Sequence, residues 1–398
     1  MIDSHSFGHH IQPFLHTPTE NLPRILGRYK GTHPGPRVIC VGGMHGNEPT
    51  GVWALKSVLS QLEGMDPDGF AGEFIALTGN RTALNKSVRC CDIDFNRVWT
   101  EARVKALLAD EMEMDLSENR EQKEFMDLLK PMIEEHDHEV YLIDLHTTSS
   151  HSAPFAVIGD TYRNQQFALQ LPVPVILGLE EHIDGTLTEY CNELGATTIA
   201  FEGGQHQDPN SAILHEALVW MTLEYADCLP DEFVPKEPHP LQVLETAGRH
   251  LPAALEVHRR HAIVPEDQFF MNPGFANFDR IDRGEELAHD IHGVITAEMD
   301  GRILMPLYQG QGDDGFFIGK EVSPEELQVW LFLRKLEASQ LLTSLPGVKF
   351  LEEEGRSMRL SKEAQMQIPV KLLRMLGFRK QRQRGDDIVI WRRKHEQD

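Results

Sequence analysis

Short apolar runs rich in β-branched residues alternate with amphipathic stretches over the first 227 residues, and this alternation constrains the fold more than any other feature. Helical periodicity is found at about 50–62, 101–136 and 210–227. The strand-like runs lie at residues 37–42, 73–78, 139–146, 154–158 and 197–202. Strands that alternate with helices form a sheet covered by helices on both faces. We therefore expect an α/β fold for this part of the chain.

The pattern changes after a proline-rich segment at residues 230–240. From about 255 to 320, short apolar pieces are separated by glycine turns, which is typical of a small all-β domain. Residues 323–398 have a different composition, with helical periodicity near 324–343 and 362–376 and a hairpin pattern at 379–393. We predict an α/β domain over 1–240, a small β domain over 241–322 and a short α+β tail module over 323–398.

Charge is distributed unevenly along the 398 residues, which carry a formal net charge of −24. Residues 1–240 account for −21, whereas residues 321–398 carry +3. An acidic body of this kind argues against nonspecific binding to nucleic acid or to an acidic membrane surface. The tail is basic between residues 371 and 394, so we expect it to pack on the acidic body of its own or a neighbouring chain. Binding of an acidic partner or of nucleic acid by the tail is the alternative. The sequence leaves open whether the protein forms a homo-oligomer.

The compartment is suggested by what the sequence lacks. No apolar run approaches the roughly 20 residues that a membrane-spanning helix needs. The N-terminal residues MIDSHSFGHH show neither the basic region nor the apolar region of a signal peptide. The five cysteines are too few and too scattered for a disulfide framework. We expect a cytoplasmic protein.

The first candidate site residues are His45 and Glu48, which follow the Gly42–Gly43 turn at the end of a predicted strand. Open α/β sheets bind ligands at the carboxyl ends of their strands. His146 closes another apolar strand and supplies a third side chain at the same edge. Two histidines and a glutamate are one of the ligand sets of catalytic zinc, which keeps a fourth position open. The sequence therefore predicts one zinc per chain, although cobalt or manganese accept the same ligands.

The residues around this set suggest what the metal would do. Asp144 precedes His146 by two positions, where its carboxylate could accept the second ring N–H of the histidine. Glu202 ends another apolar strand and is followed by two glycines, so it is a candidate base for a water molecule. Arg89 and the pair Asn96–Arg97 could hold a carboxylate or polarise a carbonyl. Ion pairing of these arginines with Asp92 or Asp94 is the alternative interpretation.

The order of these motifs resembles the succinylglutamate desuccinylase/aspartoacylase family, which is related to the zinc carboxypeptidases. The sequence contains GGMHGNE, then GNRTALN, then an arginine before DFNR, then DLH and FEGG. The resemblance runs from about residue 35 to about 320 and leaves the last 78 residues outside. It implies a zinc-carboxypeptidase-like mixed sheet flanked by helices, followed by a small β domain that closes the site.

The resemblance also implies a role for each candidate. His45, Glu48 and His146 would bind zinc, Glu202 would activate the water, and Arg89 would polarise the scissile carbonyl. Asn96 and Arg97 would hold the carboxylate of an amino-acid substrate. The activity implied is that of a zinc-dependent amidohydrolase that cleaves a small N-acyl amino acid into an acid and an amine without an acyl-enzyme, as in amino acid metabolism.

Two departures from the aspartoacylase pattern concern the substrate. Residues 186–201 contain no arginine, although aspartoacylases carry one shortly before the general base for the second carboxylate of the substrate. Phe316 stands where that family has a tyrosine that closes over the substrate. These differences leave the acyl group and the amino acid undetermined.

Two other functions fit the same residues. A metallocarboxypeptidase that trims peptide C-termini would use the same ligands, but a β domain walling the cleft disfavours long substrates. A non-catalytic metal-site binding protein is the third interpretation, and the presence of both Glu202 and Arg89 argues against it.

Overall fold

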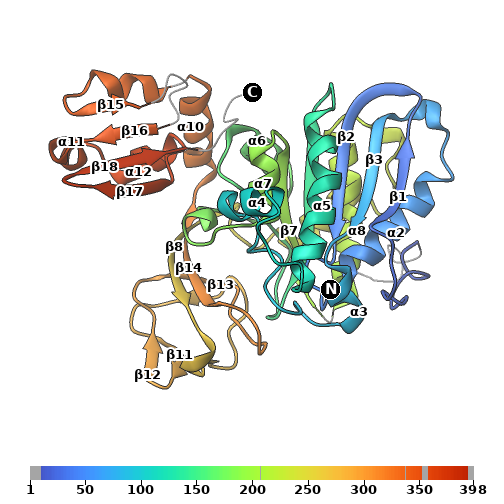
Figure 1. Ribbon diagram of the computed structural model, residues 1–398, viewed down its shortest axis with the longest axis horizontal. Coiled ribbons are helices and arrows are strands. Elements are labelled where there is room, and N and C mark those ends of the chain that lie inside the picture. Colours follow the sequence, from blue (N-terminus) through green and yellow to red (C-terminus); the bar gives the residue numbers. More distant parts are fainter. Residues whose placement is uncertain (1–9, 207, 337, 352–356, 393–398) are drawn as a thin grey trace.

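The computed structural model describes residues 10–206, 208–336, 338–351 and 357–392. One mixed sheet runs through most of the molecule (Figure 1), with the strand order β1-β3-β2-β4-β7-β5-β6-β8-β14-β13-β10 among the described residues. Its strands are β1 Ile25–Lys30, β2 His33–Gly42, β3 Ala71–Thr78, β4 Val140–Thr148, β5 Phe155–Val157, β6 Val175–Leu177, β7 Thr197–Gln205, β8 Ala254–Ala262, β10 Arg280–Ile281, β13 Gly301–Leu304 and β14 Asp314–Val322. The expected α/β fold with a mixed sheet is confirmed.

The centre of the sheet is parallel. Strands β3, β2, β4 and β7 run side by side in the same direction, so their carboxyl ends meet at one edge. Alternate side chains of a strand point to opposite faces. In β2, Val38 and Cys40 belong to one buried cluster, while Ile39 and Val41 belong to another. Both faces are therefore covered, which explains why these strands are continuous apolar runs rather than alternating ones.

Helices cover the two faces of the sheet. On one face, α2 and α8 pack together, and on the other lie α5 and α7. The α-helices described between residues 10 and 250 are α2 Thr50–Leu62, α3 Arg81–Lys86, α4 Glu101–Leu108, α5 Ser117–Glu134, α6 Tyr162–Ala168, α7 Leu187–Glu193, α8 Asn210–Tyr225 and α9 Pro240–Gly248. None of the helices that the structure describes is long and apolar enough to cross a membrane.

The helical stretch expected over 101–136 is two helices rather than one. The break between α4 and α5 is stabilised from elsewhere in the chain, because the Asp92 carboxylate accepts hydrogen bonds from the backbone N–H and the hydroxyl of Ser117 at the start of α5. The stretch expected near 362–376 is also divided. Pro369 separates α11 (Lys362–Gln367) from α12 (Val370–Met375), since proline restricts Ile368 before it to an extended backbone.

The region after residue 250 is rich in short strands, as expected. Strands β8, β14, β13 and β10 continue the main sheet, because β8 pairs in parallel with β6. A second sheet has the order β12-β11-β9 and consists of β9 Phe270–Met271, β11 Glu286–Asp290 and β12 Gly293–Thr296. The predicted boundaries at 240 and 322 stay predictions; the structure adds that the β region shares its largest sheet with the α/β region.

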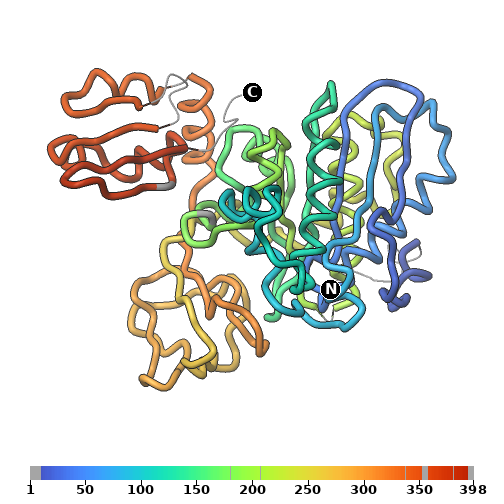
Figure 2. Tube along the Cα trace, in the orientation of Figure 1, coloured from blue at the N-terminus to red at the C-terminus, as the bar shows by residue number. Residues whose placement is uncertain are grey.

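The C-terminal module, residues 323–391, has its own four-stranded antiparallel sheet in the order β15-β16-β18-β17. The module contains α10 Pro324–Lys335, β15 Val348–Phe350, β16 Ser357–Leu360, α11, α12, β17 Lys380–Arg384 and β18 Asp387–Trp391. Strands β17 and β18 form the expected hairpin around Gly385, whose φ of +67° suits a tight turn. Figure 2 shows the chain returning from β14 into α10, which lies beside α6.

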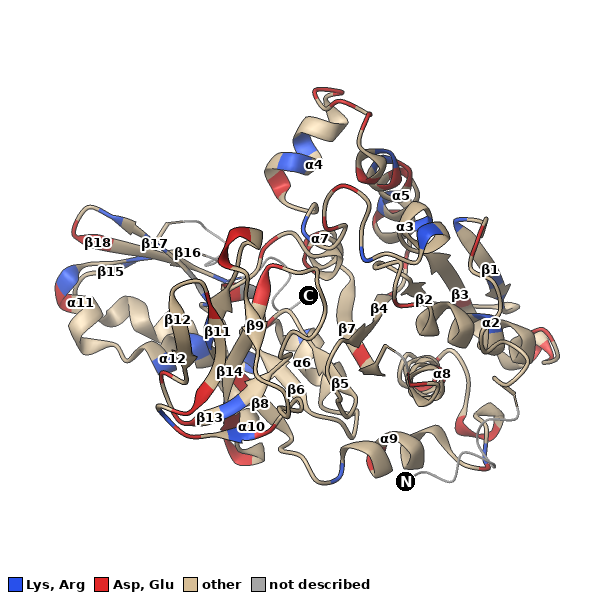
Figure 3. Ribbon diagram, turned by 90° about the horizontal axis from the view of Figure 1, so that it is seen from below, with Lys and Arg blue, Asp and Glu red and all other residues tan. Residues whose placement is uncertain are grey.

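Charge follows the division expected from the sequence. Figure 3 shows Asp and Glu on several elements of the α/β region and Lys and Arg at the β17–β18 hairpin and on α11. The module also packs on the acidic body of its own chain, through ion pairs of Arg374 and Arg379 with Glu181.

Candidate active site

The loop between β2 and α2 presents His45 and Glu48. Gly43 allows the turn after β2 with a φ of +78°. His45 and Glu48 are both buried, and His45 Nδ1 lies 2.9 Å from Glu48 Oε1. The loop packs closely on α3, because a Cβ at Gly46 would lie 2.1 Å from the carbonyl carbon of Ala83.

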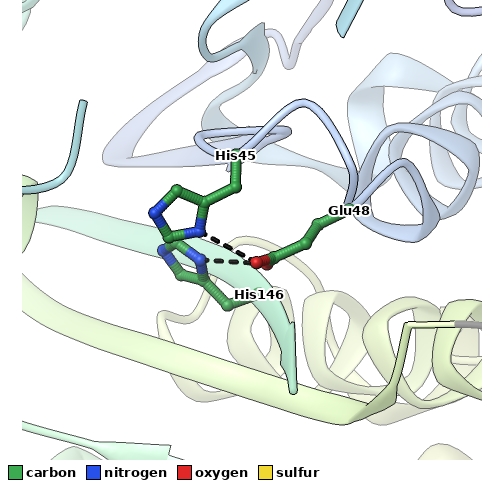
Figure 4. Close-up of side chains that lie close together, drawn as sticks. All are labelled: His45, Glu48 and His146. Atoms are coloured by element: carbon green, nitrogen blue, oxygen red, sulfur yellow. Dashed lines mark hydrogen bonds and ion pairs between the residues drawn. The ribbon is translucent and has the colours of Figure 1, made fainter. Parts of the chain in front are cut away.

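His146 reaches the same point from β4. Its Nδ1 lies 3.2 Å from Glu48 Oε2, and the backbone N–H of Thr147 donates to that oxygen at 2.9 Å. Figure 4 shows the two imidazoles side by side, with the Glu48 carboxylate facing both. One ligand atom from each of His45, Glu48 and His146 lies within 4.8 Å of the others. This buried triad is consistent with a metal site, and its donor set is one that zinc favours.

Carboxylates stand behind both imidazoles. Asp144 Oδ2 lies 2.8 Å from His146 Nε2, which leaves Nδ1 directed at the triad, as the sequence led us to expect. Asp94 Oδ1 lies 3.3 Å from His45 Nε2 in the same way. Such outer carboxylates orient ligand histidines and raise their basicity. The contact of Asp94 with His45 was not foreseen.

The charges of the triad follow from these contacts. Burial alone would raise the pKa of Glu48, but His45 and His146 hold it well below its usual value, so Glu48 is ionised. Burial would likewise lower the pKa of His146, but Asp144 and Glu48 raise it well above its usual value. In a metal-free protein this histidine therefore carries a proton that a metal would have to displace.

Glu202 lies on β7 beside the triad. It is in register with His146 of the neighbouring parallel strand β4. Its Oε2 atom is buried and has no hydrogen-bond partner among the residues that the structure describes. Burial, together with the charges of Glu48 and Asp144, raises the pKa of Glu202 to about 8. An unpartnered carboxylate with this pKa is suited to exchanging protons near neutral pH.

Arg89, Asn96 and Arg97 line the same cavity as the triad and Glu202. Arg89 donates to Asp94 Oδ2 from Nε at 3.1 Å and from Nη2 at 2.8 Å, and its Nη1 lies 3.8 Å from Glu48. Arg89 therefore pairs with Asp94, as the alternative interpretation expected, and it also lines the cavity. Its role toward a substrate stays a prediction. Asn96 Nδ2 lies 3.4 Å from His146 Nε2.

Arg97 has a partner that lies 217 residues away in the sequence. Its Nη2 donates to Asp314 Oδ2 at 3.0 Å, and Asp314 also pairs with Arg260. The guanidinium of Arg97 is therefore already opposed by a carboxylate from β14. Asp92, the other acid considered as a partner for the arginines, instead accepts hydrogen bonds from Ser117.

The cavity has a volume of about 150 Å³. Its lining combines the triad, Glu202 and the two arginines with apolar side chains, which are those of Val157, Ile158, Leu179, Ile183, Leu307 and Phe317. The sequence left open whether Phe316 lines the site. Phe316 is not among the lining residues, because its ring stacks on His261 with centroids 5.0 Å apart and packs into the β region.

A chain of polar contacts that the sequence did not suggest lines part of the cavity and reaches the β region. Thr147 Oγ1 lies 2.7 Å from His206 Nδ1, and His206 Nε2 lies 3.3 Å from Gln309 Oε1. Asn47 Nδ2 donates to the same oxygen at 3.2 Å. His206 was visible as the end of the FEGGQH motif, but Gln309 lies in a loop that only the fold brings here.

The protein thus has a mixed α/β sheet with a buried His-Glu-His triad at the carboxyl ends of its parallel strands. These features are those of the α/β proteins that can bind a metal ion at the edge of the sheet. Residues 34–222 match the model of the succinylglutamate desuccinylase/aspartoacylase catalytic domain. The chain belongs to the succinylglutamate desuccinylase/aspartoacylase family, as its motif order suggested.

Curated relatives are distant. An aspartoacylase of Xenopus tropicalis is 29% identical over 140 residues, which cover 35% of this chain and 42% of that protein. An N-acyl-aromatic-L-amino acid amidohydrolase (carboxylate-forming) of the same organism is 30% identical over 34% of this chain and 40% of that protein. A probable aspartoacylase of Prochlorococcus marinus (strain MIT 9301) is 24% identical over 69% of this chain and 88% of that protein. The match thus spans less than half of the two frog relatives.

Solved structures share the fold. A succinylglutamate desuccinylase/aspartoacylase from Rhodobacter sphaeroides superposes with a TM-score of 0.54 at 17% identity, over 75% of this chain and 88% of that one. The ectoine utilization protein EutE (DoeB) from Ruegeria pomeroyi, in its product-bound form, gives a TM-score of 0.51 at 17% identity, over 74% and 87%.

Proposed function

We propose that this chain is a zinc-dependent hydrolase that cleaves the amide bond of a small N-acyl amino acid. One observation carries the proposal: His45, Glu48, His146 and the unpartnered Glu202 line one cavity in a member of this family. The names of the relatives, which include an N-acyl-aromatic-L-amino acid amidohydrolase, support the same reaction class.

His45, Glu48 and His146 would hold one zinc ion, with Asp94 and Asp144 fixing the two imidazoles. Zinc at this position would act as a Lewis acid and lower the pKa of a water molecule toward about 7. Glu202 would accept the proton of the attacking water and then deliver it to the nitrogen of the departing amine. This transfer balances the hydrolysis, because the water oxygen joins the acyl carbon and the C–N bond breaks.

The two arginines and Asn96 would position the substrate. Arg89 would donate to the scissile carbonyl oxygen as negative charge develops there. Asn96 and Arg97 would hold the carboxylate of the amino acid, and the substrate would then share Arg97 with Asp314.

The proposal is tested by amine release from a panel of N-acetyl, N-formyl, N-succinyl and longer N-acyl amino acids. We expect the zinc-loaded protein to release the amine and the chelated protein to be inactive. Glu202→Ala should retain its zinc, measured by elemental analysis, and lose at least about a hundredfold in kcat. Glu193→Ala, which removes an exposed carboxylate on α7, is the matched control and should keep full activity.

A different result would reassign the site. Release of C-terminal residues from peptides, with none of the N-acyl amino acids turned over, would make the protein a metallocarboxypeptidase. A zinc-loaded protein that hydrolyses neither set would contradict the enzyme proposal.

A further inference from the structure

The C-terminal module inserts buried cationic side chains into the α/β region. Arg334 on α10 is only 1% exposed and Arg379, just before β17, is only 7% exposed. Trp330, one turn before Arg334, is buried in the same apolar cluster as α2 and α8. The Arg379 guanidinium lies 5.5 Å above the Trp330 ring. The C-terminal module is therefore attached to the α/β region through side chains that are buried between the two.

Both arginines converge on Asp160, which is 1% exposed. Arg334 Nη2 lies 2.9 Å from Asp160 Oδ1, and Arg334 Nη1 donates to the Asp160 carbonyl at 3.0 Å. Arg379 Nε donates to the other carboxylate oxygen. Two guanidinium groups thus fix both the backbone and the side chain of this residue.

A second anchor lies at Glu181. Arg379 Nη1 and Arg374 Nη2 each lie 3.0 Å from one oxygen of its carboxylate. Arg379 also pairs with Glu256 on β8. Arg334 also holds the backbone beside Arg374 in place, because its guanidinium donates to the carbonyls of Met375 at 3.0 Å and of Arg374 at 3.1 Å.

The anchored residues adjoin apolar residues of the cavity lining. Asp160 directly follows Val157–Gly159, and Glu181 lies between Leu179 and Ile183. All five of these neighbouring residues line the cavity. The arginines themselves do not line it, so they could affect a substrate only through the segments that they hold.

We propose that Arg334 and Arg379 are positioning residues that set the shape of the part of the cavity lined by Val157–Gly159, Leu179 and Ile183. The C-terminal module thereby determines which apolar group the cavity accepts, and the preferred substrates carry a branched, aromatic or longer aliphatic group. This inference rests on the proposed function, because the group belongs to the N-acyl amino acid that the site would cleave.

The physics of buried ion pairs supports such a role. Each guanidinium has a fixed planar fork, so a carboxylate that pairs with it is held in one orientation. Removing one partner leaves a buried charge without compensation, and the structure around it must rearrange. A small displacement of Val157–Gly159 or Leu179–Ile183 changes the volume available to an apolar group, and one methylene can alter kcat/KM by about tenfold or more.

The central experiment compares two substrates, one N-acetylated small amino acid and one with a large apolar group. We expect Arg379→Gln to lower the ratio of kcat/KM for the large substrate to that for the small one by about tenfold. Arg379→Lys should restore part of that ratio. Arg384→Gln, which removes an exposed arginine of the same hairpin, should leave the ratio within about twofold.

The ratio separates positioning from stability. A variant that only unfolds loses active molecules, and this lowers kcat for both substrates equally. An unchanged ratio in Arg379→Gln would therefore overturn the inference. If Arg379→Gln does not fold, Arg374→Gln gives the same test with a half-buried arginine that contacts Glu181 and not Asp160.

Amide hydrogen exchange provides a readout that needs no activity. The N–H groups of Ile158, Glu181, His182 and Ile183 donate to backbone carbonyls and report on the two segments. We expect faster exchange at all four in Arg379→Gln, only at 181–183 in Arg374→Gln, and at none in Arg384→Gln. If no panel substrate is turned over, the proposed function fails, and equal exchange in Arg379→Gln and Arg384→Gln would overturn the inference separately.

Discussion

At the scale of single residues, the site depends on carboxylates that do not belong to the triad. Asp144 lies behind His146 and Asp94 behind His45, and each faces the Nε2 atom of its imidazole. Both histidines therefore present Nδ1 to Glu48. The direction of the ligand atoms is decided by these two acids rather than by the histidines themselves.

Asp144→Asn tests this arrangement. We expect the zinc affinity to fall roughly 10–100-fold, because the amide cannot stabilise the imidazole in the required orientation as the carboxylate does. Competition with a chromophoric chelator measures the affinity. Asp92→Asn is the control, since Asp92 accepts hydrogen bonds from Ser117 and touches neither histidine. Equal affinities in the two variants would contradict the role of Asp144.

The sequence was sufficient to predict that the three triad residues come together, but it did not predict the residues around them. His45 and His146 each follow an apolar run that had to be a strand, and parallel strands end at one edge, so their convergence could be predicted. The pairing of Arg97 with Asp314 could not, because it joins residues 217 positions apart through a turn and a strand of another region. The sequence also left open whether Phe316 lines the cavity. Phe317 does and Phe316 does not, since neighbouring residues on a strand face opposite sides.

At the scale of elements, the loop between β2 and α2 places two of the three triad residues and has almost no free space. Its Gly46 faces the backbone of α3, where Ala83 leaves no room for a side chain.

The elements that the sequence predicted best are those with one uninterrupted periodic pattern of apolar residues, such as α2, whose end at Leu62 was expected. Breaks stabilised by distant contacts, such as the one before Ser117, were not foreseen.

Gly46→Ala is expected to be strongly disruptive. The new Cβ would lie 2.1 Å from the Ala83 carbonyl carbon, so the loop must shift and carry His45 and Glu48 with it. We expect a loss of roughly 1–3 kcal/mol in the free energy of unfolding by urea, together with weaker zinc binding. Gly64→Ala, whose Cβ would have its nearest neighbour at 3.4 Å, should change neither quantity. A stable Gly46→Ala variant with normal zinc affinity would show that the loop is not so constrained.

At the scale of the whole molecule, buried ion pairs join three regions that are distant in sequence. Asp160 in the α/β region and Glu256 in the β region both pair with Arg379 of the C-terminal module. Burial would raise the pKa of both carboxyl groups. For Asp160, Arg334 and Arg379 outweigh burial and lower the pKa to about 2. For Glu256, His258 and Arg379 do the same, also to about 2.

These lowered pKa values predict how the free energy of unfolding depends on pH. A group with a lowered folded-state pKa contributes stability above its ordinary pKa near 4, and this is lost as the pH falls toward 2. The loss is roughly 2–3 kcal/mol for each group. Urea unfolding between pH 6 and pH 3 should therefore show a steeper decline for the natural chain than for Asp160→Asn. Glu245→Gln, which changes an exposed acid of α9, should decline like the natural chain, and equal slopes in all three would contradict the prediction.

The buried position of Asp160 has a consequence for the order in which the molecule is made. A ribosome extends the chain at about 5–20 residues per second, and N-terminal parts fold first. The triad and Glu202 are complete once residue 202 has been added, but the guanidinium groups that hold Asp160 arrive only at positions 334 and 379. A nascent chain thus has its metal-binding residues long before the apolar wall beside them is fixed. The arrangement of the cavity lining beside Asp160 is therefore completed only after residue 379 has been added.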